Sequence, residues 1–434
     1  MARIIGIRHR VKATAEGEAR PTQVVVLDEL GKETATYNLA DEQAELDFLL
    51  SNYPVQYRIL VPGEDDDINT IPDRLLKHRK VKEGEGNVAG FVYRVVDGEQ
   101  RIVTHVASEF DGLRPGDNVA MVLGGSGDYF AFALARKSEE LGASVYRIPS
   151  SKLKELRGEG KKDDDAKLLA LSLLRRQELF YEFRTRDAEL IAIREAYFAR
   201  IDAMKARIAC EQRLRQVLIG KIFCNPLGKF PEGAIEKLYD EEKANNATYQ
   251  VLLKEERKRA TELQKLVEGS EVWNFLGEVE GLGWAIVSRI LSSVVDIRRF
   301  LSKEAFKAFA GVHVLKDNTF VRRKRGVVAN WQPDFRQALY LLGEQMNKRP
   351  ESYWGQKLRE NKRLLRERHP EVVVVEGKKR YTNGHIHKMA TWRTLTQFAM
   401  WLYREWKHFD KDPENFKLIV EYPKPLQTPL EKAA

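Results

Sequence analysis

The carboxylates best suited to chemistry lie at two places in the N-terminal half of the chain. Asp163 and Asp165 open a predicted helix, and Asp128 lies just after a predicted strand. Brought together, such groups could hold Mg²⁺ ions roughly 4 Å apart for phosphodiester chemistry. Alternatively, Asp163 and Asp165 cap their helix, where negative side chains are favourable, and we favour that interpretation.

A run of four consecutive cations in the C-terminal half could bind a polyanion. Trp331 and Arg336 follow the run, and Phe320 precedes it. Cations contact phosphates, while aromatic rings stack on bases or sugars. The alternative is a solvated loop, and we favour binding because the surroundings are basic. The run is Arg322, Arg323, Lys324 and Arg325.

Gly281 and Gly283 form a second candidate for phosphate binding. They lie in residues 279–287, a pattern that resembles a helix-hairpin-helix element. Two glycines permit a tight turn that presents backbone N–H groups at a helix N-terminus. An ordinary turn between two helices explains the pattern equally well.

The elements expected to position the carboxylates form an α/β domain over residues 1–165. Three β-rich segments precede a helix capped by Asp41, and residues 54–118 are expected to form an inserted β element. A strand, a helix ending at Gly142 and a further strand then follow, with the strands parallel. The order β-β-β-α-[insert]-β-α-β-α is that of the RNase H/RuvC-like α/β fold.

The rest of the chain is predicted to be mainly helical. A continuous helix is expected from Asp163 to about Gly220, and a second charged helix follows it, so residues 166–268 are predicted to form a coiled-coil arm. Residues 269–412 are predicted to form a basic all-α domain rich in tryptophan. Residues 413–434 are rich in proline and are expected to be extended.

The positive charge is concentrated in the predicted helical domain. Residues 298–410 contain 25 Lys and Arg against 11 Asp and Glu, a net charge of +14, whereas the whole chain carries +9. The remainder therefore carries −5. A concentrated basic region beside an acidic one favours a nucleic-acid partner over an evenly charged, thermophile-type surface.

Several other classes of protein are not supported. No apolar run approaches the length of a membrane span, and no N-terminal apolar core suggests a signal peptide, so we expect no membrane association. The two cysteines, Cys210 and Cys224, suffice for neither a disulfide framework nor a zinc site, and a reducing, cytoplasmic location is expected. No P-loop and no nucleophile elbow is present.

The whole layout resembles the RuvC-containing insertion-sequence transposases that use a bridge RNA. The resemblance rests on loosely matching segments spread over nearly the full chain: residues 122–129, 141–149, 161–166, 279–290, 296–300 and 306–312. In that family a RuvC-like domain, a coiled-coil arm and a helical transposase domain follow one another. The resemblance implies that Asp163 and Asp165 correspond to two metal ligands of the family.

Departures from the family pattern weaken the expectation of nuclease chemistry. The resemblance places Arg8 at the position of the first catalytic Asp and Gly124 at that of the Glu. The family also uses a serine for strand exchange, but residues 309–333 contain none, and Asn318 and Thr319 lie nearest. Both halves of the family's active site are therefore in doubt.

The helical domain also resembles the Nop domain of box C/D ribonucleoproteins and of the TIGR-associated (Tas) RNA-guided proteins. This resemblance implies an RNA-guided DNA-binding protein that holds a small guide RNA, addresses target DNA by base pairing, and needs no cofactor for binding. A homodimer or higher homo-oligomer is expected. The alternatives are a Mg²⁺-dependent nuclease or transposase with a rearranged acidic site, and a helix-hairpin-helix DNA-binding protein without RNA.

Overall fold

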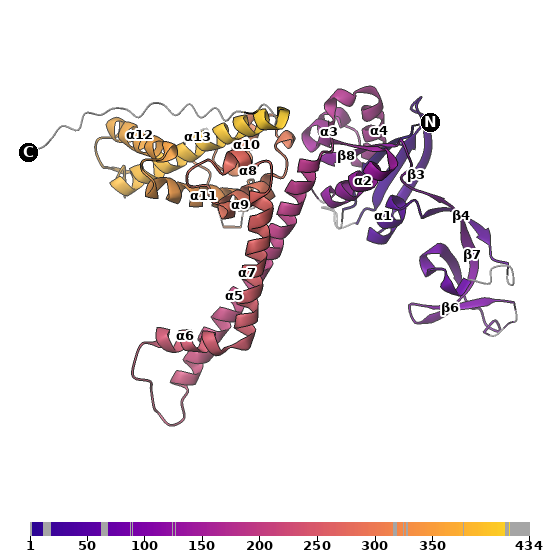
Figure 1. Cartoon of the computed structure of the whole chain (residues 1–434), viewed down its shortest axis with the longest axis horizontal. Helices are drawn as coiled ribbons and strands as arrows, with labels where there is room; N and C mark the ends of the chain where they lie inside the picture. The colour runs from indigo at the N-terminus through magenta and orange to yellow at the C-terminus, as the bar shows by residue number, and fades with distance from the viewer. Residues whose placement is uncertain are drawn as a thin grey trace, which may run out of the picture. The chain divides into compact units, whose positions relative to one another are not determined.

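The computed structural model describes residues 2–11, 19–61, 68–86, 88, 90–123, 125, 127–315, 319–323, 325–326, 329–375, 377–412 and 416. The chain divides into two compact units, Met1–Phe183 and Arg184–Ala434, coloured indigo to magenta and magenta to yellow in Figure 1. The first unit contains a six-stranded and a four-stranded sheet. The second is mainly helical, but β11 (Val373–Val375) and β12 (Lys378–Arg380) form a two-stranded sheet within it, so the prediction of an all-α domain over residues 269–412 is wrong at this hairpin. The coarse prediction of an α/β part followed by a helical part is therefore confirmed.

The main sheet of the first unit has the strand order β10-β9-β8-β1-β2-β3. The first three strands form an antiparallel meander, whereas β8 pairs parallel with both β1 and β9. The strands are β1 (Ile4–Arg8), β2 (Thr22–Leu27), β3 (Glu33–Leu39), β8 (Asn118–Leu123), β9 (Ser144–Pro149) and β10 (Tyr181–Glu182).

Helices cover both faces of this sheet, because its central strands are apolar on both sides. On one face, Phe48 of α1 and Leu134 of α2 pack against Ile5 and Ile7. On the other face, Leu169 of α4 packs with the opposite side of the sheet. The helices are α1 (Glu42–Leu49), α2 (Asp128–Leu141), α3 (Ser150–Arg157) and α4 (Asp165–Arg175), with 3₁₀ turns at Lys162–Asp164 and Gln177–Leu179.

The segment between α1 and β8 forms a separate small antiparallel sheet with its own apolar cluster around Val103 and Val106. The long strand β7 pairs with each of the other three strands. The strands are β4 (Tyr53–Ile59), β5 (Leu76–Lys80), β6 (Val92–Val96) and β7 (Glu99–Asp111), with 3₁₀ turns at Ile68–Thr70 and Asp73–Leu75. The acidic stretch at 64–67 lies outside the described residues.

The predicted continuous helix from Asp163 to about Gly220 is wrong. The chain leaves the helical conformation after Arg175, forms β10 at the sheet edge, and becomes helical again at Thr185. Leu169 and Leu173 are buried against the sheet, so α4 belongs to the first unit and not to the arm. The residues between Asp163 and Gly220 are mostly good helix formers, so their composition does not indicate a break. Packing of α4 and β10 against the sheet imposes it.

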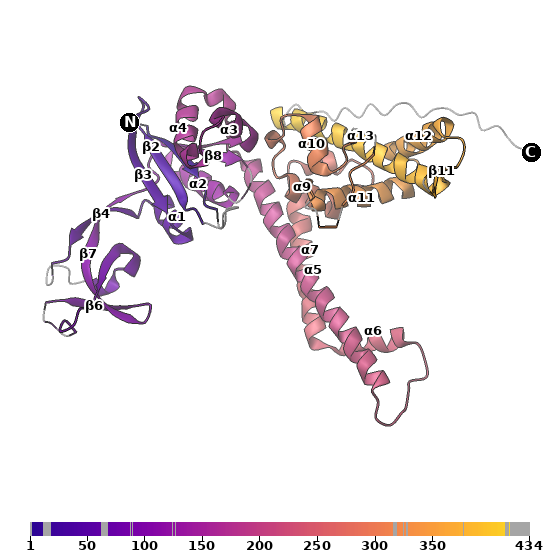
Figure 2. The ribbon, with the colours of Figure 1, turned by 180° about the vertical axis from the view of Figure 1, so that it is seen from behind.

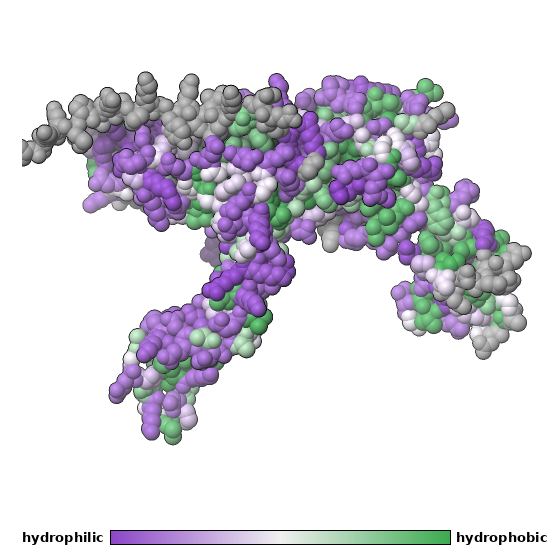
Figure 3. All heavy atoms as spheres, in the orientation of Figure 1, coloured by the Kyte–Doolittle hydropathy of each residue, from purple (hydrophilic) through white to green (hydrophobic). Residues whose placement is uncertain are grey.

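The helical unit combines the arm and the basic domain in one structure. The arm consists of α5 (Thr185–Phe223), α6 (Ile235–Asn245) and α7 (Ala247–Glu268), with α5 and α7 side by side in both views (Figures 1 and 2). Leu190 and Ile193 of α5, with Leu263 and Val267 of α7, belong to the core of the basic domain. Away from that core, hydrophilic side chains predominate on the face of the arm shown in Figure 3.

The basic domain packs its apolar side chains around Phe306, Phe335 and Phe398. Its elements are α8 (Trp273–Leu276), α9 (Trp284–Val294), a 3₁₀ turn (Ile297–Arg299), α10 (Lys303–Ala310), α11 (Pro333–Lys348), α12 (Tyr353–Arg368), β11 (Val373–Val375), β12 (Lys378–Arg380) and α13 (Asn383–Lys411). The predicted tail at 413–434 lies outside the described residues, except for Phe416. None of the described helices has the length and apolar character that crossing a bilayer requires.

Candidate functional site

The predicted carboxylates lie at the end of β1 because α4 packs very closely on that strand. A Cβ atom on Gly6 would lie 1.9 Å from the carbonyl oxygen of Ala166 and 2.7 Å from the backbone nitrogen of Ala170. Only glycine permits this approach. The close packing brings Asp163 and Asp165, at the start of α4, into electrostatic contact with Arg8 at the end of β1.

Arginine side chains occupy this site together with the two acids. Asp163 Oδ1 lies 3.0 Å from Arg20 Nη1, and Asp165 accepts two hydrogen bonds from Arg157, at 2.6 and 2.7 Å. We call Arg8, Arg20, Arg157, Asp163 and Asp165 the strand-end cluster. No side-chain hydrogen bond caps α4, whose N-cap residue is Asp164, so Asp163 and Asp165 are not capping residues in that sense. Asp165 does lie in the first turn of α4, where a negative charge is favourable, as the favoured interpretation expects.

Arg8 is the member of the strand-end cluster with the least favourable surroundings. Burial lowers the pKa of its guanidinium, and the neighbouring charge of Arg20 lowers it further, while Asp163 and Asp165 oppose the shift. Its Nε is buried without a hydrogen-bond partner among the described residues. The position that the family pattern assigns to a metal-binding Asp therefore carries a partly desolvated cation.

Asp128, the third predicted carboxylate, belongs to a different interaction. It begins α2 and forms a hydrogen-bonded ion pair with Arg147 of β9, and both side chains are almost completely buried. Arg147 also lies over the ring of Phe183, 5.7 Å from its centroid. Asp128 is thus held in a buried pair, and it does not join Asp163 and Asp165 in one cluster.

These residues do not fit a two-metal site. Such a site needs several carboxylates converging on the ions, whereas each of the three acids here has an arginine partner. Within the described part of the chain, no group of three or more His, Cys, Asp or Glu side chains could hold a metal ion. Gly124 lies outside the described residues. No catalytic step through Mg²⁺ follows from this arrangement.

In the helical unit, the predicted basic loop is exposed. Arg322, Arg323 and Arg325 all have exposed side chains, while Lys324 lies outside the described residues. None of these three arginines has a carboxylate partner among the described residues. They are therefore placed to contact a polyanion without breaking an existing ion pair.

Trp331 and Arg336 anchor this loop. The Arg336 guanidinium lies 4.5 Å from the Trp331 ring centroid and 4.9 Å from that of Trp392, and it donates to the carbonyl oxygen of Val321 at 2.7 Å. Burial lowers the pKa of Arg336. Arg336 is therefore engaged in holding the loop against α11 and α13, which differs from the direct binding role that the sequence suggested.

Gly281 and Gly283 form the turn between α8 and α9. Gly281 has φ +94°, and a Cβ there would lie 3.1 Å from the Cβ of Gln345 on α11. Gly283 is the N-cap residue of α9, and its carbonyl accepts from the amide of Val287 at 3.1 Å. The turn is thus packed against α11, as an ordinary helix–helix turn would be, and its binding to phosphate stays a prediction.

A cleft of about 710 Å³ opens beside the basic loop. Segments far apart in the sequence line it: the loop at 319–322, α11, the end of α12, β12 and the start of α13. Its described lining contains cations and aromatic rings and no carboxylate. We call it the basic cleft; its lining is Thr319, Phe320, Val321, Arg322, Arg336, Leu365, Arg368, His369, Arg380, Tyr381, His385, Lys388, Met389 and Trp392.

The aromatic rings that line the basic cleft, which we call its aromatic wall, are held in place by stacking and by a hydrogen bond. His369 and Tyr381 stack with ring centroids 3.9 Å apart and planes 4° apart. The backbone amide of Tyr381 donates to His385 Nδ1 at 3.0 Å. Burial lowers the pKa of His385, and the charges of Arg380 and Arg322 lower it further, so protonation of this imidazole is disfavoured.

A second cleft of about 670 Å³ lies between α10, α12 and α13. It also contains cations and aromatic rings, but two of its cations have acidic partners. Lys357 Nζ lies 2.8 Å from Glu360 Oε2, and Arg404 Nε lies 2.7 Å from Glu405 Oε1. The second cleft is therefore less suited to an anion than the basic cleft.

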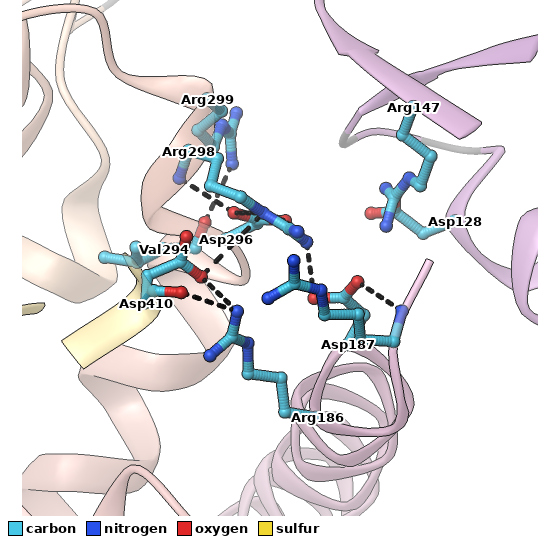
Figure 4. A network of polar contacts seen from close by, with 10 residues as sticks. Asp128, Arg147, Arg186, Asp187, Val294, Asp296, Arg298, Arg299 and Asp410 are labelled. Atoms are coloured by element: carbon cyan, nitrogen blue, oxygen red, sulfur yellow. Dashed lines mark hydrogen bonds and ion pairs between the residues drawn. The ribbon is translucent and has the colours of Figure 1, made fainter. Parts of the chain in front are cut away.

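Other arginines of the helical unit are structural. Arg298 hydrogen-bonds Asp296 at 2.7–3.0 Å and Asp187 at 2.5 Å, and Arg186 lies 3.0 Å from Asp410 (Figure 4). Burial disfavours the charge of Arg298, but the two acids outweigh burial and raise its pKa. This buried network joins the start of α5 to the turn after α9 and to the end of α13.

Much of the basic cleft is not apparent from the sequence. Arg368, Arg380 and Lys388 lie 40 to 70 residues beyond the basic loop in the sequence, and no local motif links them to it. The available signal was the polar, Lys- and Arg-containing excursion at 371–383. Comparison with known proteins gives no identification, because no family model matches the chain and no curated protein matches its sequence significantly.

Proposed function

We propose that this protein binds a small structured RNA through its helical unit and addresses DNA through base pairing by that RNA. The observation that carries the proposal is the basic loop with its adjoining cleft, where exposed arginines have no carboxylate partners among the described residues. Such a surface suits RNA, which is recognised through phosphates, shape and stacking of unpaired bases. Sequence specificity for DNA then comes from pairing, as in other RNA-guided systems.

We further propose that the first unit is a RuvC-like domain that does not cut DNA. The antiparallel β1–β2–β3 meander, followed by the parallel β8 and β9 with α2 between them, supports the RuvC-like part. The ion pairs of Asp128, Asp163 and Asp165 with arginines support the loss of cleavage. The domain would serve as a scaffold or as a contact surface for nucleic acid.

The deciding experiment is to purify the full chain from cells that carry its gene with the flanking DNA, and to sequence the nucleic acid that co-purifies. One discrete small RNA is the expected result. A chain that binds DNA but retains no RNA would overturn the proposal in favour of a DNA-binding protein without a guide.

Plasmid cleavage tests the second part of the proposal. The purified protein with its RNA is expected to leave a supercoiled target plasmid intact in the presence of Mg²⁺. Nicking that disappears in the double variant Asp163→Ala, Asp165→Ala would replace the proposal with a Mg²⁺-dependent nuclease.

A further inference from the structure

We infer that the basic cleft is a site for one unpaired RNA nucleotide, with its base against the aromatic wall and its flanking phosphates on Arg368, Arg380 and Lys388. This inference rests on the proposed function, because it gives the basic cleft the role of holding one nucleotide of the bound RNA. The cleft, at about 710 Å³, lies within the size range of small-ligand sites. Its walls come from several elements, so the folded unit forms it before any ligand arrives.

Tyr381 is the first reason to expect a base-binding site. Its backbone is in the left-handed region, with φ +58°, which is unfavourable for an aromatic residue, and such strained residues cluster at functional sites. The surroundings enforce this conformation: Arg366 donates to the Tyr381 carbonyl at 3.0 Å, and His385 accepts from its amide. The ring is therefore fixed in place beside His369, as a stacking platform requires.

The charges around the platform are the second reason. Arg322, Arg368, Arg380 and Lys388 are exposed at the cleft, and within the described part of the chain none of them has an ion-pair partner. Arg366, by contrast, is engaged with the carbonyl of Tyr381 and the side chain of Asn383. Arg366 therefore supports the aromatic wall, whereas the four exposed cations remain available to bind phosphates.

The shape of the cleft selects against double-stranded nucleic acid. Phe320, His369, Tyr381 and Trp392 are all partly buried within it, so a base must leave its own stack to reach them. Bases within a duplex are stacked on each other, whereas bases of loops, bulges and ends can be splayed out. An unpaired nucleotide flanked by two phosphates is therefore the ligand whose chemistry matches both the rings and the cations.

The test measures binding of the full chain to two RNA probes by fluorescence anisotropy: a 12-nucleotide oligouridylate and a blunt 12-base-pair RNA duplex. The double variant Arg368→Ala, Arg380→Ala removes exposed cations, and Tyr381→Asn removes the ring while keeping a residue that tolerates φ > 0. Lys303→Ala, Lys357→Ala is the matched control, since it removes the same charge from the second cleft without leaving a buried acid unpaired.

We expect each cleft variant to bind oligouridylate about tenfold or more weakly, with less than about a twofold change for the duplex and for the control variant. For the double variant, the slope of log affinity against log salt concentration should become shallower by roughly 1.4. Retention of wild-type affinity for oligouridylate by both cleft variants would overturn the inference. An equal loss for both probes would also overturn it, since the cleft would then be only a general basic surface.

Different results would reject the proposed function and the nucleotide site. If the wild-type chain binds neither probe and retains no RNA on purification, the proposed function fails, and this inference fails with it. If the wild type binds RNA and only the basic-loop variants lose affinity, the proposed function stands and the nucleotide site is rejected. Tighter binding of oligodeoxyuridylate than of oligouridylate would reassign the site to the DNA.

Discussion

The strand-end cluster of the sheet unit and the basic cleft of the helical unit both gather arginines, but with opposite consequences. In the strand-end cluster, Arg20 and Arg157 are paired with Asp163 and Asp165, so the guanidinium groups satisfy acids that would otherwise be available to a metal ion. In the basic cleft, Arg368 and Arg380 have no such partner among the described residues. The comparison indicates that the partners of a charge, more than the number of charges, decide whether it is engaged within the fold or remains available to a ligand.

The strongest test of this comparison concerns a paired arginine in the helical unit. Arg298→Met should destabilise the unit by about 3–5 kcal/mol, because Asp187 and Asp296 are left buried without their counterion. Urea unfolding of the purified chain measures the change. Arg322→Met, at an exposed position without a carboxylate partner, should stay within about 0.5 kcal/mol of the wild type. Similar stabilities for the two variants would abolish the distinction between paired and unpaired arginines.

The next test reverses the charge of the basic loop. Replacing Arg322, Arg323 and Arg325 by Glu should weaken RNA binding by at least about 100-fold at moderate salt, because several phosphate contacts become repulsive. The matched control replaces Lys254, Arg257 and Lys258 on α7, which are also exposed, by Glu. The control should bind within a few-fold of the wild type in a filter-binding assay. Equal losses would mean that net charge alone governs binding.

A smaller effect is expected from Mg²⁺ on the sheet unit. A ligand that binds the native state raises its unfolding temperature in a concentration-dependent manner. Because arginines occupy the strand-end cluster, about 10 mM Mg²⁺ should shift the unfolding temperature no more in the wild type than in Asp163→Ala, Asp165→Ala. A rise that is specific to the wild type would show that the arginines are displaced and the acids bind the metal.

The smallest effect is expected at Arg8. Its lowered pKa indicates that burial disfavours the charge, so Arg8→Met should change the free energy of unfolding by less than about 1 kcal/mol, and in the stabilising direction. Arg147→Met, which leaves Asp128 buried and unpaired, is the contrasting variant and should cost about 3–5 kcal/mol. A large loss for Arg8→Met would identify it as a necessary part of the strand-end cluster.

Local patterns predicted the elements of the chain better than the contacts between them. Apolar strands and helix-ending glycines such as Gly142 revealed the α/β part, because these signals act within a few residues. The break between α4 and α5 depends on packing against the sheet, and no local residue signals it. The sequence predicts the arm and the basic domain as separate parts, whereas the side chains of Leu190 and Val267 are buried in one shared core.

The candidate site was predicted only in part for the same reason. The basic run and Trp331 were visible because they are adjacent in the sequence. The partner of Asp128 lies 19 residues away, and Asp187, the second acid bound by Arg298 besides the nearby Asp296, lies 111 residues away, so sequence patterns could not show these pairs. The same holds for Arg380, which lies more than 50 residues from the basic loop in the sequence and which folding brings to the same cleft.

The shared core has a mechanical consequence for the arm. The 39 residues of α5 span roughly 60 Å at the rise of an α-helix, and the beginning of this helix lies in the core of the basic domain. Tyr197 of α5 is completely enclosed there, so the base of the arm cannot pivot without disrupting packed side chains. The base of the arm is therefore held rigidly by the core of the basic domain. The same core contains side chains of α11, α12 and α13, which also line the basic cleft.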